Sequence, residues 1–139
     1  MPLRIDNWQM AFSSELEKPR YFLWGKDDCC LFACDIIKAI TKVDPAYSFR
    51  GKYKSALGAY REIRKQGFTG VMDVAEKRCA ENNWPEIPIL TAQRGDVVCA
   101  LFNNQESLGI ITGDSAAFVG GAGYVYIAPE SALKAWRIG

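Results

Sequence analysis

Residues 22–30 read Phe22-Leu23-Trp24-Gly25-Lys26-Asp27-Asp28-Cys29-Cys30 and join a glycine-containing loop to a strongly apolar segment. From Asp28 to about Thr41 the chain is apolar nearly all round, which predicts a buried central helix rather than a surface helix. The loop therefore delivers Cys29 to the first turn of that helix, where unpaired amide N–H groups and the helix dipole favour a thiolate. The alternative is that Cys29, Cys30 and Cys34 are small core residues, since free cysteine is commonly buried.

Helical spacing of apolar residues predicts three further helices in the first half of the chain. The first covers residues 5–16, has Asp6 as its N-cap and ends before Pro19. Two more are expected from about Tyr53 to Gln66 and from about Val71 to Asn83. Gly67 stops the earlier of these two. Its expected apolar face consists of Ala56, Leu57, Tyr60 and Ile63.

After Pro88 the apolar residues alternate, which is typical of strands. The expected strands are Asp96–Phe102, Leu108–Thr112, Ala116–Val119 and Gly123–Ala128, followed by a short helical turn after Pro129 and a last strand at residues 136–138. Asn103-Asn104 and Gly113-Asp114 suit hairpin turns between them. The sequence thus predicts an α+β fold, with N-terminal helices (about 1–85) packed on a C-terminal antiparallel sheet (about 86–139).

Composition indicates one globular domain covering residues 1–139. Hydrophobic residues make up 49% and charged residues 24%, which is ordinary for a folded protein. Seventeen Lys and Arg against sixteen Asp and Glu leave a net charge of +1, so a nucleic-acid partner is not expected. No apolar run approaches about 18 residues and Met1-Pro2-Leu3-Arg4 is no signal peptide, so we expect neither a membrane span nor secretion.

The sequence contains no histidine, which excludes an imidazole base or a histidine metal ligand from this chain. Its five cysteines are Cys29, Cys30, Cys34, Cys79 and Cys99. An odd number in a chain without a signal peptide argues against a disulfide scaffold. Cys29 lies about 100° from Cys30 and about 140° from Cys34 around a helix, which matches no compact metal motif. We therefore expect neither a metal nor a cofactor.

Trp24-Gly25 and Asp28-Cys29, followed by a buried helix, resemble the start of the NlpC-type papain-like cysteine peptidases. The resemblance is closest to small phage-encoded members found with tail genes. It continues through Asp44-Pro45, residues 50–53 and the turn Arg94-Gly95-Asp96, and then through Leu108-Gly109-Ile110 and Ala135-Trp136-Arg137-Ile138. It implies a single papain-like domain with Cys29 as the nucleophile and Asp28 directly before it. It also implies a place in the virion tail after assembly in the bacterial cytoplasm.

The active peptidases of that family carry a histidine where this chain has Ser107. A serine hydroxyl does not titrate near neutral pH, so it neither takes the thiol proton nor protonates a leaving amine. Losing general acid–base assistance alone costs about 10²–10⁴-fold in rate. Asp28, Asp96 or Tyr126 could act as a substitute base, although an ordinary carboxylate is a poor acid toward an amine. Cys29 is thus expected to be a vestigial nucleophile.

The resulting hypothesis is a structural protein of a phage or prophage tail tip, or of tail assembly, built on a degenerate NlpC-like domain and contacting other tail proteins. The alternative is a peptidoglycan endopeptidase or amidase in which Cys29 uses an unusual or borrowed base. A third possibility is a module that binds peptidoglycan without cutting it, with Trp24 lining the groove. Without an imidazolium partner, we expect burial to keep the Cys29 thiol protonated near neutral pH.

Overall fold

The computed structural model describes residues 3–139, so Met1 and Pro2 of the expected domain lie outside the described part. The helices are α1 (Trp8–Glu17), α2 (Cys29–Thr41), α3 (Ala56–Lys65) and α4 (Val71–Glu81), with short 3-10 turns η1 (Ile89–Thr91) and η2 (Pro129–Ser131). The strands are β1 (Glu86–Ile87), β2 (Val97–Phe102), β3 (Gln105–Ile111), β4 (Ala116–Gly120), β5 (Gly123–Ile127) and β6 (Lys134–Trp136). No helix within residues 3–139 is long and apolar enough to cross a membrane.

The strands form one antiparallel sheet in the order β1-β6-β2-β3-β4-β5. Strands β2 to β5 follow one another as a meander. Asn103 and Asn104 have φ values of 51° and 62°, which the tight turn between β2 and β3 requires. Strand β6 then returns to pair with β2 on its other side. The predicted α+β fold with an antiparallel sheet is confirmed.

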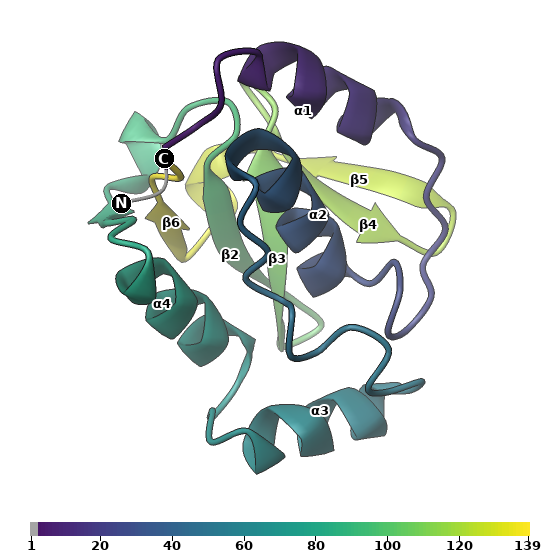
Figure 1. The fold of residues 1–139 in the computed structure, drawn as a ribbon. Coiled ribbons are helices and arrows are strands. Elements are labelled where there is room, and N and C mark those ends of the chain that lie inside the picture. The colour runs from purple at the N-terminus through teal and green to yellow at the C-terminus, as the bar shows by residue number, and fades with distance from the viewer. Residues whose placement is uncertain (1–2) are drawn as a thin grey trace.

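Helix α2 lies across the sheet, as Figure 1 shows. Its residues Phe32, Ile36 and Ile40 are fully buried and share one core with Val97 and Ile110 of the sheet. Helix α1 packs on α2 and contributes Phe12 to the same core. The predicted central helix is therefore confirmed, and Asp35 and Lys38 are among its few residues that reach solvent.

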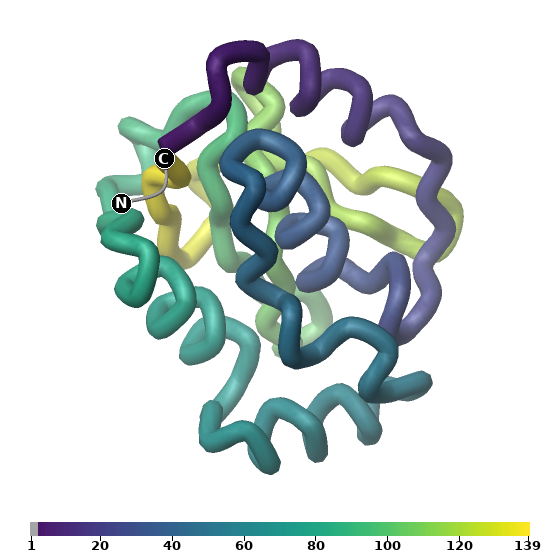
Figure 2. Tube along the Cα trace, viewed as in Figure 1, coloured from purple at the N-terminus to yellow at the C-terminus, as the bar shows by residue number. Residues whose placement is uncertain are grey.

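The two ends of the described chain lie side by side (Figure 2) and are joined through Asp96. The Asp96 carboxylate is fully buried and pairs with Arg4 at 2.9 Å and Arg137 at 3.0 Å. It also accepts hydrogen bonds from the backbone N–H groups of Gln93 and Ile138. This carboxylate satisfies four donors at once, so its role here is to hold the fold closed.

Helix α3 differs from its predicted form. It begins at Ala56, after the N-cap Ser55, and its expected apolar face is wrong in part because Leu57 and Tyr60 are 57% and 56% exposed. The cause is that α3 packs, through Ala59, against Phe49 and Tyr53 of the preceding loop rather than against the sheet. Figure 1 shows the helix set apart from the other layers, below α2.

Smaller boundary errors have tertiary causes. Helix α1 takes Asn7 as its N-cap in place of Asp6, because Ile5 is fixed by a hydrogen bond from its N–H to the carbonyl of Ile40 at 2.8 Å. Helix α4 ends at Glu81, before Asn83 with its φ of 58°. Strand β1 was missed because a strand of two residues is too short to show the alternation of apolar and polar side chains. The last strand is residues 134–136 rather than 136–138.

Candidate functional site

The loop that leads into α2 turns at Gly25, where φ is +83°. A Cβ atom at this position would collide with the Tyr53 carbonyl oxygen, so the loop admits only glycine. Gly25 donates its N–H to the Asp28 carboxylate at 3.0 Å and accepts the N–H of Gly51 at 3.1 Å. The close contact fixes the loop against residues 51–53 and thereby sets where α2 begins.

Asp28 is the N-cap of α2 and is 1% exposed. Its Oδ1 accepts the N–H of Leu31 at 3.0 Å, and its Oδ2 accepts the N–H of Gly25 and the Tyr53 hydroxyl, the latter at 2.6 Å. Burial and the facing Asp28 carboxylate raise the pKa of Tyr53, which stays a neutral donor. The helix predicted to start near Asp28 thus begins directly after this residue, which caps it. With three donors bound, Asp28 is a structural anchor rather than a free base.

Cys29, directly after this cap, meets strand β3. Its thiol contacts the side chains of Cys30 and Ser107 and the backbone N–H of Leu108. Strand β3 pairs with β4 only through Ile110 and Ile111, so its edge before Ile110 is open to the start of α2. The structure therefore brings together Asp28, Cys29 and Ser107, three residues singled out in the sequence.

The hydrogen bond from the Cys30 thiol, helped by the Ser107 hydroxyl and the Leu108 N–H, lowers the pKa of Cys29 to about 7. These donors outweigh the opposing effects of burial and of the Asp28 charge. The same hydrogen bond, with burial, raises the pKa of Cys30, so Cys30 keeps its proton. The expectation that burial holds Cys29 protonated near neutral pH is therefore wrong. The thiolate is stabilised without an imidazolium, because neutral thiol, hydroxyl and amide donors lie beside it.

Two other residues considered as substitute bases lie away from Cys29. Asp96 precedes β2 and faces Ile111, whereas Ser107 pairs with Ala100, four residues or roughly 13 Å along the strand. Its carboxylate is also occupied by Arg4 and Arg137. Tyr126 is 54% exposed on β5, which β4 separates from β3. Neither residue is placed to take a proton from Cys29.

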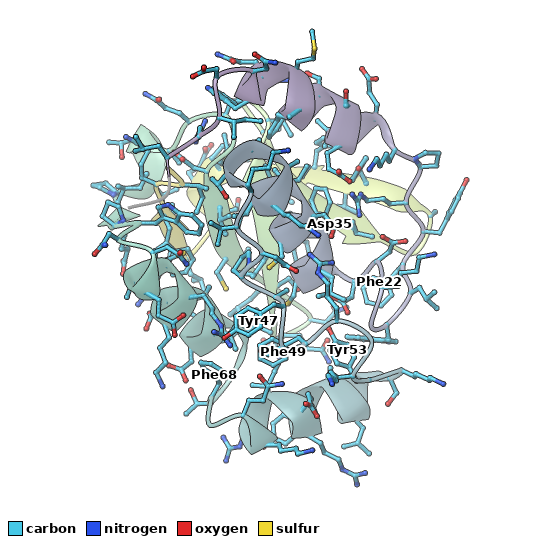
Figure 3. The ribbon with its side chains drawn as sticks, in the orientation of Figure 1. Phe22, Asp35, Tyr47, Phe49, Tyr53 and Phe68 are labelled. Atoms are coloured by element: carbon cyan, nitrogen blue, oxygen red, sulfur yellow. The ribbon has the colours of Figure 1, made fainter. Side chains whose placement is uncertain are left out.

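A cavity of about 800 Å³ opens beside Cys29 and extends toward α3. Its lining is largely apolar and includes Trp24, Phe49, Tyr53, Tyr60, Leu108 and Phe118. The Trp24 ring stacks edge-on against Phe22 and Tyr53, with ring centroids 4.8 and 6.5 Å apart. Figure 3 shows Phe49, Tyr53 and Phe68 gathered between α2 and α3. Trp24, the residue proposed to line a groove, thus lies in the cavity wall.

The site has no arrangement suited to a metal. All five cysteines are free, and within residues 3–139 no group of three or more cysteine or acidic side chains is placed to hold an ion. Cys34 and Cys79 are buried in the helical layer, and burial raises the pKa of Cys79 to about 12. What the arrangement offers chemically is a nucleophilic thiolate without an acid–base partner.

Residues 3–138 match a family described as a domain of unknown function, DUF6950. The chain belongs to this family. No curated protein and no solved structure gives a significant match to it.

Two contributors to the site were missed in the sequence. Tyr53 reaches Asp28 from a loop 25 residues later, and no local pattern announces that contact. Cys30 was considered only as a core residue or ligand, although its place beside Cys29 makes it the nearest thiol donor. Two adjacent cysteines in the first turn of a helix were the signal that could have identified it.

Proposed function

We propose that this protein is a structural component of a phage or prophage tail tip, or of tail assembly, built on a papain-like, NlpC-like domain that has lost hydrolysis. The observation that carries the proposal is the contact between Cys29 and Ser107. Ser107 stands where the resembled peptidases carry their base, and the open edge of β3 holds it against the thiol. The place in a phage tail rests on the sequence resemblance.

The chemistry supports loss of peptide cleavage. Attack on an amide carbonyl forms a tetrahedral intermediate whose amine leaves only after it has been protonated. The donors beside Cys29 are a thiol, a hydroxyl and a backbone N–H, and none becomes a strong acid when the thiolate forms. In a peptidase the imidazole takes the thiol proton and then delivers it to the amine. Here the proton lost from Cys29 is not held for return.

The partners we propose are other tail proteins, with peptidoglycan as a further one. Helix α3 carries the exposed Leu57 and Tyr60, and Arg64 lies over the Tyr60 ring at 5.6 Å. Exposed aromatic and arginine side chains are common in protein interfaces. This surface supports a role in protein–protein contact, because the inner side of α3 packs on the domain and its outer side is exposed to solvent.

The proposal predicts that the protein copurifies with phage particles. Particles from an induced lysogen or an infected culture carrying this gene should contain the chain at a fixed ratio to tail proteins, measured by quantitative mass spectrometry after density-gradient purification. A ratio that falls with each purification step, or a chain found solely in the soluble fraction, contradicts the structural role.

A second candidate is a peptidoglycan endopeptidase or amidase that uses Cys29 with an unusual base. The lowered pKa of Cys29 favours it, because more of this thiol than of an ordinary thiol is in the nucleophilic, ionised form near neutral pH. The cavity beside the thiol also has room for a substrate. This candidate predicts release of soluble muropeptides that depends on Cys29, whereas the structural role predicts none.

A further inference from the structure

We propose that Cys29 is a thioester-exchange site, which takes the acyl group of an apolar acyl thioester and retains it as a stable thioester. The proposal rests on one part of the proposed function, the absence of a base beside Cys29, and goes beyond it by assigning the thiol a reaction. It concerns the chain itself and holds whether or not the protein is in a virion.

Without a histidine, the reactions that remain possible at Cys29 are those whose leaving group needs no general acid. An amine must be protonated before it leaves a tetrahedral intermediate, but a thiol, whose ordinary pKa is about 8.5, leaves directly as a thiolate. Thioester exchange therefore needs an ionised attacking thiol and no general acid. Cys29 meets this requirement through the donors of Cys30, Ser107 and Leu108.

The step balances without a further reactant. The Cys29 thiolate attacks the carbonyl carbon of the acyl thioester and forms the new carbon–sulfur bond. The bond from that carbon to the carrier sulfur then breaks, and the carrier leaves as a thiolate with the electron pair. The carrier thiolate takes its proton from water, and no group is oxidised or reduced.

The surroundings of the thiol suit the charge that develops on the carbonyl oxygen. Cys29 and Cys30 are the first two residues of α2, so their N–H groups have no carbonyl four residues earlier within the helix. The Leu31 N–H is taken by Asp28, and the Phe32 N–H by the Asp28 carbonyl. Two amide donors therefore remain for an oxyanion beside Cys29, in addition to the helix dipole.

The cavity determines which acyl group fits. It has a volume of about 800 Å³ and begins at Cys29, within the range of roughly 300–1,000 Å³ typical of small-molecule pockets. Trp24, Phe49 and Tyr53 give its wall an aromatic surface. The lining also contains three charged residues, Asp28, Arg78 and Glu106, and each has protein partners. Asp28 accepts three hydrogen bonds and Glu106 accepts the N–H of Met72, while Arg78 donates to Tyr47, Ser48 and Glu81. An uncharged aliphatic acyl chain is therefore the substrate class that the cavity accommodates.

Retention of the acyl group on Cys29 follows from the absence of a base beside the thiol. Hydrolysis of the acyl group requires a base that activates water, and Ser107 cannot act as one. The acyl group is then removed by another thiol, through the reverse of the forward step. The site thus behaves as a carrier of an acyl group rather than as a hydrolase.

The test uses S-octanoyl-N-acetylcysteamine as the acyl thioester, with the full chain at about pH 7.5. Intact mass spectrometry should show addition of one octanoyl group, and peptide mapping should place at least about tenfold more of it on Cys29 than on any other cysteine. Neutral hydroxylamine should remove it. Cys29→Ala should abolish the adduct, with circular dichroism confirming that the variant is folded.

Cys30→Ala is the matched variant, because it retains Cys29 and removes the nearest donor. It should slow acylation at pH 7 by about tenfold and recover most of the rate at pH 9, where an ordinary thiol ionises. Equal rates for wild type and Cys30→Ala at pH 7 would overturn the assigned role of the thiol pair.

Two results would overturn the exchange proposal itself, and they differ in meaning. If Cys29 reacts with iodoacetamide at pH 7 but not with the thioester, acyl exchange is wrong while the loss of hydrolysis stands. If octanoate is released continuously in a reaction that depends on Cys29, a base is present, and both the exchange site and the proposed loss of hydrolysis are wrong.

Discussion

The Tyr53 hydroxyl donates a 2.6 Å hydrogen bond to Oδ2 of Asp28. This bond ties the loop before α3 to the first turn of α2, and both groups are buried. It positions Cys29 indirectly, since Asp28 is the cap from which the helix begins. The consequence is that the reactivity of the thiol and the stability of the domain depend on the same carboxylate.

Replacing Tyr53 by Phe should lower the free energy of unfolding by about 1–2 kcal/mol, because the buried Asp28 carboxylate loses one donor. Asp28→Ala should cost more, about 2–4 kcal/mol, because it also removes a helix cap and the Gly25 contact. Urea denaturation followed by tryptophan fluorescence measures both. A Tyr53→Phe variant as stable as wild type would show that this hydrogen bond does not contribute.

The Cys29 thiol should titrate near neutral pH. Iodoacetamide labelling, read by peptide mass spectrometry between about pH 5 and 10, should have its midpoint close to pH 7 for Cys29, well below that of the other cysteines. Ser107→Ala and Cys30→Ala should each move the midpoint upward, because each removes a donor to the thiolate. Asp28→Asn should move it downward, because it removes a nearby negative charge. A Cys29 midpoint near pH 9 in wild type would contradict the site described here.

The domain should lose stability in mild alkali. Burial raises the pKa of Cys99 and Cys79 to about 12, and the pKa values of Cys30 and Cys34 are raised as well. Above about pH 9 the unfolded chain releases these protons and the folded chain does not, so the free energy of unfolding falls as pH rises. Cys29 acts in the opposite sense, since its lowered pKa adds stability between about pH 7 and 9.

Thermal melts at several pH values between about 7 and 10.5 check this balance, with the midpoint expected to be highest near pH 8. Cys99→Ala serves as the matched control, because it removes one of the raised groups and should flatten the alkaline fall. A melting temperature that stays constant up to about pH 10.5 would be inconsistent with four thiols whose pKa values are raised in the folded chain.

Asp96→Ala should be among the most destabilising single changes, at about 3–5 kcal/mol, because it leaves the guanidinium of Arg4 partly buried without its charge partner. Arg137→Ala should cost much less, since its side chain is 36% exposed. Both are measured by denaturant unfolding. Similar costs for the two variants would show that Asp96 does not close the fold in the way described.

The sequence was sufficient for the parts of the fold that local patterns determine. The apolar run after Asp28 predicted α2 and its approximate start, and the alternation after Pro88 predicted the strands of the meander. Helix α3 was only partly predictable, because its exposed Leu57 and Tyr60 look like core residues in sequence. The pairing of β6 with β2 and β1 depends on contacts made across the whole chain.

The site was predictable to a similar extent. Cys29 and Ser107 were singled out through the resemblance to the NlpC-type peptidases, and the fold places them in contact. The ionisation of Cys29 was predicted wrongly, because it depends on Cys30 and on the Leu108 N–H at an open strand edge. Tyr53 and the cavity arise from the loop between α2 and α3, whose path has no periodic signal.

The most direct test of the central claim, that this site has a nucleophile but no hydrolysis, is digestion of purified sacculi. Wild type, Cys29→Ala and Ser107→His are incubated with peptidoglycan, and soluble muropeptides are separated by liquid chromatography and identified by mass. We predict that wild type releases no more than Cys29→Ala, and that Ser107→His alone recovers little, because a substituted base also needs an orienting group. Muropeptide release by wild type that disappears in Cys29→Ala would contradict the claim.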